Sequence, residues 1–112
     1  MSVSDKTHIL VDLVNTIASR AQTSDEAKSY TAQLLNAGTE KCARKFGEEA
    51  IELILATTRD DKPHLTAEAA DVIYHLLVVL QSAGIPFETV LEELTRRSNQ
   101  SGLQEKAARD DG

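Results

Sequence analysis

The stretch TAEAADVIYHLLVVLQS, from Thr66 to Ser82, constrains the fold of this chain more than any other part of its sequence. It has the length and the spacing of a helix, and apolar residues occupy almost its whole circumference. Such a helix must be covered on most sides, and a chain of 112 residues supplies few partners for it. We therefore expect an all-α bundle that is completed by dimerisation with a second copy of the chain.

Apolar residues recur at helical spacing in other segments too. The predicted helices are His8–Arg20, Ser29–Ala37, about Thr39–Thr58, Thr66–Ser82 and about Pro86–Arg97, with a polar interruption at Thr23–Ser29. The last helix is expected to pack through Phe87, Val90, Leu91 and Leu94. Gly38 suits the end of the second helix, while Thr39 and Thr66 are expected to cap the third and fourth, with a loop at Arg59–His64. Because no alternating strand pattern occurs, the sequence predicts four to five helices in one domain, residues 1–112, with a polar tail from about residue 98.

Composition narrows the class of protein. The net charge of −6 argues against broad nucleic-acid binding, which normally uses a basic surface. The longest apolar run, around Leu76–Leu80, is too short to span a membrane, and the N-terminal residues do not form a secretory signal. Cys42 is the only cysteine, which excludes an internal disulfide and fits a core position in a reducing compartment. We therefore expect a cytoplasmic protein that binds neither nucleic acid nor membranes.

Five carboxylates interrupt the two longest predicted helices: Glu48, Glu49 and Glu52 in FGEEAIEL, and Glu68 and Asp71 in AEAADVIYHLL. On a helical wheel Glu49 points toward the apolar arc, Glu52 lies at its edge and Glu48 lies further out. If the two helices are antiparallel, Glu49 and Glu52 can face Glu68 and Asp71 across the hairpin. Four oxygen ligands suit Mg²⁺, or Mn²⁺, much better than zinc.

The glutamates of a single ExxE motif in a helix usually lie on a solvated surface. An ExxE motif paired with an ExxD motif is a more specific indication of a metal site. A helical interaction module with an acidic face for a basic partner is an alternative, although it does not explain Glu49 at an apolar-face position. Lys41 and Lys45 lie on the same side as Glu49 and can extend the site toward several phosphates. Lys45 and Glu49 can equally form a simple surface ion pair.

The histidines give little information about the site from the sequence alone. His75 is interpreted as a hydrogen-bonded structural residue rather than a ligand, and His8 and His64 carry no usable signal.

Three segments resemble the phosphoribosyl-ATP pyrophosphatases, all-α enzymes of histidine biosynthesis within the MazG-like pyrophosphohydrolases. They are SYTAQLLNAGTEKCARKFGEEAIELILA, EAADVIYHLLVVL and the tail RRSNQSGLQEKAAR, which begin at Ser29, Glu68 and Arg96. The paired acidic motifs are typical of the superfamily, and the context of the first segment and the tail are typical of the histidine enzyme.

The resemblance implies a MazG-like bundle that hydrolyses phosphoribosyl-ATP to phosphoribosyl-AMP and pyrophosphate, the second step of histidine biosynthesis. It implies Mg²⁺ ligands at Glu49, Glu52, Glu68 and Asp71, with Glu48 either orienting a ligand or activating water. Lys41, Lys45, Arg96 and Arg97 are candidate phosphate contacts. The nearest rival is a housecleaning pyrophosphohydrolase that acts on noncanonical nucleotides. A cyclohydrolase that uses the product would be a separate partner chain.

Overall fold

The computed structural model describes residues 6, 8–22, 29–99 and 109. Its elements are α1 (His8–Ala21), α2 (Tyr30–Ala37), α3 (Thr39–Ala56), α4 (Lys62–Ser82) and α5 (Phe87–Ser98). No strand occurs among these residues, so the predicted all-α class and the five helices are confirmed. Most of the polar tail and most of the predicted Thr23–Ser29 interruption lie outside the described residues.

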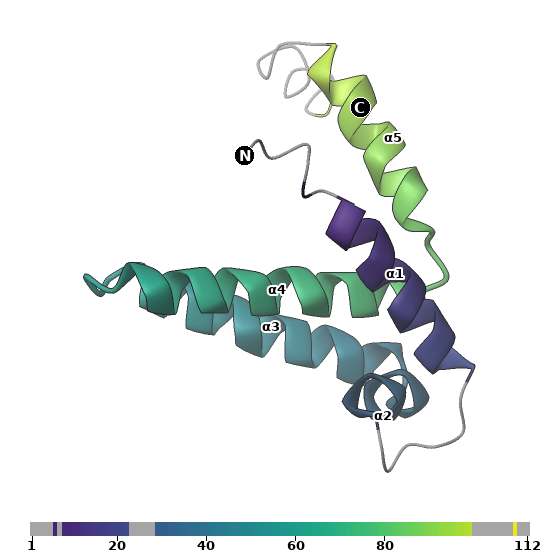
Figure 1. Ribbon diagram of the computed structural model, residues 1–112, viewed down its shortest axis with the longest axis horizontal. Coiled ribbons are helices and arrows are strands. Elements are labelled where there is room, and N and C mark those ends of the chain that lie inside the picture. Colours follow the sequence, from purple (N-terminus) through teal and green to yellow (C-terminus); the bar gives the residue numbers. More distant parts are fainter. Residues whose placement is uncertain (1–5, 7, 23–28, 100–108, 110–112) are drawn as a thin grey trace.

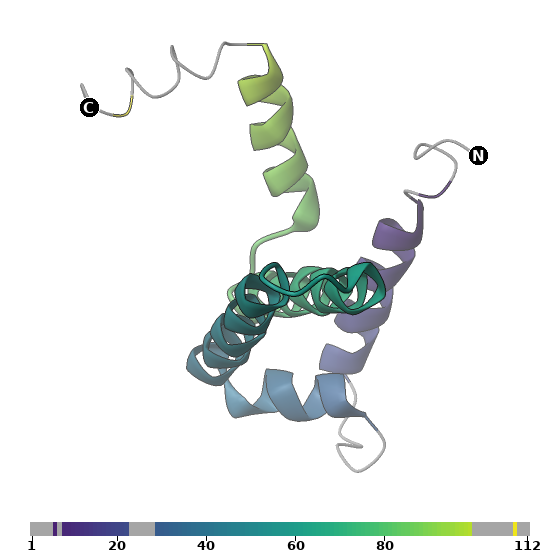
Figure 2. The same cartoon turned by 90° about the vertical axis from the view of Figure 1, so that its left-hand side faces the viewer.

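The two longest helices, α3 and α4, form an antiparallel hairpin (Figure 1). The helix α2 lies across the end where α3 begins, and α1 crosses the hairpin near the C-terminal end of α4 (Figures 1 and 2). Gly38, at φ 100°, joins α2 to α3 and donates its N–H to the Leu35 carbonyl, as expected for a glycine that ends a helix. The hairpin is therefore the body of the molecule on which the site is built.

Two predicted N-caps are wrong. The helix α4 begins at Lys62, and Asp61 caps it by accepting a hydrogen bond from the His64 N–H at 3.0 Å. Thr66 lies inside the helix and donates its hydroxyl to the Lys62 carbonyl. Pro63 occupies the first turn, where a missing N–H costs nothing, so it starts this helix rather than ending a loop.

The other error concerns Thr39, which does not cap α3. Gly38 occupies that position without a side-chain hydrogen bond, and the Thr39 hydroxyl donates instead to the Ser82 carbonyl at 3.1 Å. The helix α3 also ends at Ala56, two residues before the predicted end at Thr58.

The buried core is small and lies where α1, α2 and the hairpin meet. Its buried cluster consists of Ile17, Leu34, Cys42, Leu77 and Val78. Cys42 is fully buried, as predicted, and its thiol donates to the Leu34 carbonyl at 3.1 Å. These five side chains hold α1, α2 and the first half of α3 against the second half of α4.

The helix α5 extends away from the hairpin (Figures 1 and 2). It was predicted to pack through Phe87, Val90, Leu91 and Leu94. Phe87 contacts the core, but Leu91 and Leu94 are 42% and 56% exposed, so the prediction is wrong for the second half of the helix. An amphipathic pattern shows that a helix has an apolar face, but not that the same chain covers it.

Within the described residues, no single helix has the length and apolar character needed to cross a membrane. The bent pair α4 and α5, which meet at 113°, meets that criterion only when both are taken together.

Candidate metal and phosphate site

Three of the predicted ligands come together on the hairpin. One carboxylate oxygen each from Glu49 of α3 and from Glu68 and Asp71 of α4 lie within 4.8 Å of one another. Asp71 follows Glu68 by three residues and so lies on the same face of α4. The antiparallel arrangement then places Glu49 opposite that face, as the sequence predicted.

The surroundings of these carboxylates favour a cation. The side chains of Glu49 and Glu68 are only 20% and 14% exposed. The Oε2 atom of Glu68 is buried and has no hydrogen-bond partner among the described residues. Clustered, partly buried carboxylates repel one another and lose hydration, and a divalent cation reverses both costs. An oxygen-only donor set fits a hard cation such as Mg²⁺ or Mn²⁺.

Glu48 and Glu52 lie outside this group of three. Glu52 is exposed on α3, and its role as a ligand stays a prediction. Glu48 is also exposed, and its Oε2 lies 3.2 Å from the Lys45 Nζ. The sequence reasoning placed Glu48 further out than Glu49, and the structure agrees.

Lys45 links the basic and acidic parts of the site. Its Nζ lies 3.9 Å from the Glu49 Oε1 as well as 3.2 Å from Glu48, so the ion pair considered from the sequence is present. The hydrogen bond to Glu48 is the main cause that raises the pKa of Lys45 above its ordinary value of 10.5. Lys45 therefore stays charged next to the carboxylates, where it can serve a phosphate.

His75 lies one turn beyond Asp71 and is buried, with 6% exposure. Its Nδ1–H donates to the Asp71 carbonyl at 2.9 Å, and its ring packs edge-on against Tyr30 and Tyr74. The hydrogen bond predicted for His75 is confirmed. Its buried Nε2 has no partner among the described residues.

His64 is a neighbour of the site that the sequence reasoning missed. Its Nε2 lies 3.7 Å from the Glu68 Oε1. The signal was the i, i+4 spacing of His64 and Glu68, which has meaning only if the helix already includes residue 64. Because the predicted helix began at Thr66, this spacing was not recognised as a helical pair.

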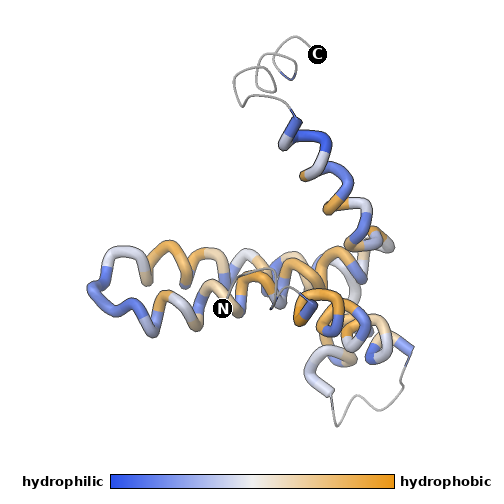
Figure 3. The backbone as a smooth tube through the Cα atoms, turned by 45° about the horizontal axis from the view of Figure 1, so that its top comes forward, coloured by the Kyte–Doolittle hydropathy of each residue, from blue (hydrophilic) through white to orange (hydrophobic). Residues whose placement is uncertain are grey.

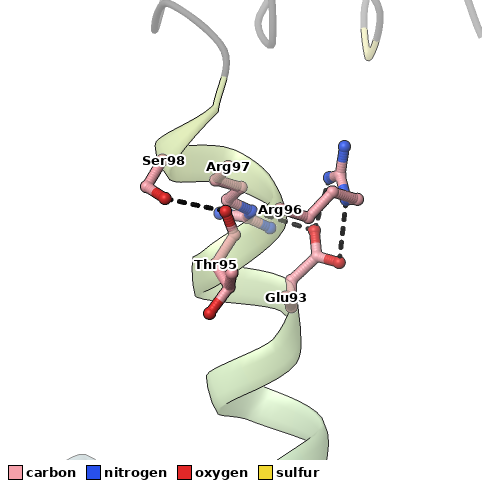
Figure 4. Close-up of polar contacts among 5 residues, drawn as sticks. All are labelled: Glu93, Thr95, Arg96, Arg97 and Ser98. Carbon is pink, nitrogen blue, oxygen red and sulfur yellow. Dashed lines mark hydrogen bonds and ion pairs between the residues drawn. The ribbon is translucent and has the colours of Figure 1, made fainter.

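Arg96 and Arg97 are placed on α5, away from the three carboxylates. Both contact Glu93: Arg96 Nη2 lies 2.5 Å from its Oε1, and Arg97 Nε lies 3.0 Å from the same atom (Figure 4). Their hydrogen bonds lower the pKa of Glu93 to about 2. Within one chain, the structure does not bring these arginines to the acidic group, and their phosphate contacts stay a prediction.

A helical hairpin that brings Glu49 of the ExxE motif to Glu68 and Asp71 of the ExxD motif agrees with the class that the sequence predicts, the MazG-like pyrophosphohydrolases. Comparison with known proteins narrows this class. The family model "Phosphoribosyl-ATP pyrophosphohydrolase" matches residues 10–98.

Curated relatives agree with that match. A phosphoribosyl-ATP pyrophosphatase of Methylobacterium nodulans is 55% identical over 92% of this chain and 95% of its own length. One from Allorhizobium ampelinum is 53% identical over 92% of this chain and 98% of its own length. The chain belongs to the phosphoribosyl-ATP pyrophosphohydrolase family.

Proposed function

We propose that this chain hydrolyses phosphoribosyl-ATP to phosphoribosyl-AMP and pyrophosphate, in the cytoplasm, as a step of histidine biosynthesis. The observation that carries the proposal is the convergence of Glu49, Glu68 and Asp71 on the hairpin of a chain from this family. The cut falls between the α and β phosphates, because the products are a monophosphate and pyrophosphate.

We propose Mg²⁺ as the resident ion, with Mn²⁺ as an effective substitute, held by Glu49, Glu68 and Asp71 and completed by Glu52. Glu52 lies one turn after Glu49 on α3, so a change of its side-chain rotamer can bring it toward the same face. Bound there, the ion would supply positive charge to the phosphates and lower the pKa of the attacking water.

The chain's own residues position the substrate around that centre. Lys45, held between Glu48 and Glu49, places a permanent positive charge beside the carboxylates for a β or γ phosphate. Glu48 then either accepts a proton from the attacking water or orients a ligand through Lys45, and a pH profile of the Glu48→Gln variant distinguishes these two roles.

We also propose that the active form is a homodimer. Exposed apolar side chains follow α3 at i, i+3 and i+4 and α4 at i, i+3, namely Ile51, Ile54 and Leu55, then Ile73 and Leu76. Apolar turns are visible on both helices of the hairpin, mixed with polar ones (Figure 3). The Cα radius of gyration is 16.4 Å, against about 13 Å for a compact domain of this length. A second copy of the chain would cover these residues and complete the helical bundle.

A homodimer also offers Arg96 and Arg97 a place in the reaction, because α5 of one subunit can then approach the hairpin of the other. The cyclohydrolase that would use the product is expected to be a separate chain.

The test is to incubate the protein with phosphoribosyl-ATP, and separately with common and noncanonical nucleoside triphosphates, and to measure pyrophosphate release. Release from phosphoribosyl-ATP with Mg²⁺ or Mn²⁺, and its loss with EDTA, is the expected result. Turnover of noncanonical triphosphates without turnover of phosphoribosyl-ATP would establish the housecleaning activity instead.

A further inference from the structure

A pocket lies between α2 and α3, beside the group of three carboxylates. Its volume is about 240 Å³, and its lining residues are Tyr30, Gln33, Leu34, Ala37, Lys41 and Lys45. Two of these are lysines and none is an acid, although the chain as a whole carries a net charge of −6. A pocket with positive charge and a half-exposed aromatic ring suits a phosphorylated sugar or nucleotide rather than a cation.

The pocket and the carboxylates share a wall. Lys45 lines the pocket, and its Nζ lies 3.9 Å from the Glu49 Oε1. On the other helices, the Tyr30 ring lies edge-on to His75 with ring centroids 6.2 Å apart, and His75 donates to the Asp71 carbonyl. A single substrate can therefore occupy both places.

The two lysines differ in their distance from the carboxylates. At 1.5 Å per residue, Lys45 lies about 6 Å before Glu49 along α3, and Lys41 lies about 12 Å before it. A triphosphate bound at the carboxylates is therefore nearer to Lys45, and Lys41 lies about one helical turn further from it. Lys41 also makes no ion pair within the described part of the chain, whereas Lys45 contacts Glu48 and Glu49.

We propose that this pocket binds the phosphoribosyl group of the substrate, with Lys41 on its phosphate and the Tyr30 ring against its sugar or the adjoining base. The inference rests on the proposed function, because the phosphoribosyl group is what distinguishes phosphoribosyl-ATP from ATP. In this assignment the carboxylates and Lys45 hold the triphosphate, and α2 with Lys41 determines which nucleotide is accepted.

The experiment compares the wild type with the Lys41→Met and Tyr30→Leu variants, with Tyr30→Phe as the conservative variant that keeps the ring. The KM and kcat are measured for phosphoribosyl-ATP, and the inhibition constants for ATP and for ribose 5-phosphate. Lys41→Met should raise the KM about tenfold, as for the loss of one charged contact, with kcat within about twofold. It should weaken inhibition by ribose 5-phosphate and leave inhibition by ATP unchanged. Tyr30→Leu should act in the same direction, and Tyr30→Phe much less.

Arg44→Met is the matched control, because Arg44 lies on the same helix but pairs with Glu40 outside the pocket. Its kinetic constants should stay at the wild-type values, and circular dichroism should show the same helicity in every variant. Equal weakening of ATP and phosphoribosyl-ATP in Lys41→Met would place the triphosphate in the pocket and overturn the inference. An unchanged KM would also overturn it. A wild type that releases no pyrophosphate from phosphoribosyl-ATP would overturn the proposed function, and this inference with it.

Discussion

The hairpin of α3 and α4 and the helix α5 both carry many charges, yet they use them in opposite ways. On the hairpin, Glu49 and Glu68 are largely buried, and one oxygen of Glu68 has no partner within the described residues. On α5, Glu93 is more exposed and receives hydrogen bonds from both Arg96 and Arg97 (Figure 4). The hydropathy of the two regions also differs, with apolar and polar turns mixed along the hairpin and a mostly polar α5 (Figure 3).

This contrast distinguishes a candidate binding site from an ordinary charged surface. Charges that are satisfied by neighbours on the same exposed helix contribute little to stability and need no ligand. Carboxylates that gather in an apolar setting without enough partners cost stability, and they persist where a ligand compensates for that cost. Glu49 and Glu68 on the hairpin have the burial expected of the second kind, and this is why we propose an ion beside them.

The largest expected effect is on activity. Glu49→Gln or Asp71→Asn should lower Mg²⁺-dependent pyrophosphate release by about 10³-fold, roughly 4 kcal/mol in activation free energy, because each removes one of the charged ligands that we propose. Circular dichroism should show an unchanged fold. Glu92→Gln on α5 is the matched control and should stay close to the wild-type rate. Full activity in both hairpin variants would contradict the assignment of the ligands.

The second prediction concerns the core that supports the hairpin. Leu77 is 4% exposed, so Leu77→Ala should lower the free energy of unfolding by about 2–5 kcal/mol through lost burial and the cavity that remains. Urea denaturation followed by circular dichroism measures this change. Thr95→Ala on exposed α5 is the comparison and should change the value much less, since its hydroxyl only donates to the Leu91 carbonyl of the same helix.

The third prediction tests the proposed covering of the hairpin by a second copy. Ile54 and Ile73 are 62% and 45% exposed, so the double variant Ile54→Glu, Ile73→Glu should leave each chain folded. It should weaken dimerisation by roughly 100-fold, about 2.7 kcal/mol, because charge would be buried in an apolar interface. Analytical ultracentrifugation gives the association constant. A wild type that sediments as a monomer would refute the dimer.

The smallest effects should have opposite signs in the two regions. Without metal, Glu49→Gln should raise the unfolding midpoint slightly, because it relieves repulsion among like charges, worth a few tenths of a kcal/mol per pair. Glu93→Gln should lower the midpoint slightly, because Arg96 and Arg97 lose their acceptor. Thermal unfolding in EDTA measures both. Shifts of the same sign would remove the distinction between the regions.

The pH dependence of α5 provides a check on the last prediction. The arginines lower the pKa of Glu93 to about 2 from an ordinary 4.5. A lowered pKa means that the folded chain holds the ionised form more firmly than the unfolded chain does. The contribution of this carboxylate is therefore fully present above pH 4.5 and fades as the pH falls toward 2. Carboxyl NMR shifts of Glu93 should show that titration, and a midpoint near 4.5 would contradict the ion pairs.

Local patterns in the sequence predicted most of the fold. Gly38 marked the junction of α2 and α3, Cys42 was placed in the core, and the spacing of apolar residues gave all five helices. The failure at the start of α4 came from Pro63, which the sequence reasoning treated as part of a loop. Proline is also favourable in a first helical turn, and the Asp61 cap decides between the two.

Helical geometry was enough to predict which carboxylates gather, except for Glu52, which lies outside the group of three. The spacing on each helix, together with an antiparallel hairpin, was enough to bring Glu49 to Glu68 and Asp71. Contacts between elements that are distant in sequence, such as Tyr30 with His75, depend on how α2 crosses the hairpin, and no local pattern encodes that. The exposure of Leu91 and Leu94 could not be predicted either, because an apolar helix face does not show which element, if any, covers it.

The hydrogen bond from the Thr39 hydroxyl to the Ser82 carbonyl also affects how the two helices of the hairpin are aligned. It ties the start of α3 to the end of α4, while the short loop before Asp61 ties their other ends. Together these two links fix the axial register of one helix against the other. A slip of a single turn would displace the facing carboxylates by about 5.4 Å, which is more than the 4.8 Å within which their oxygens now gather.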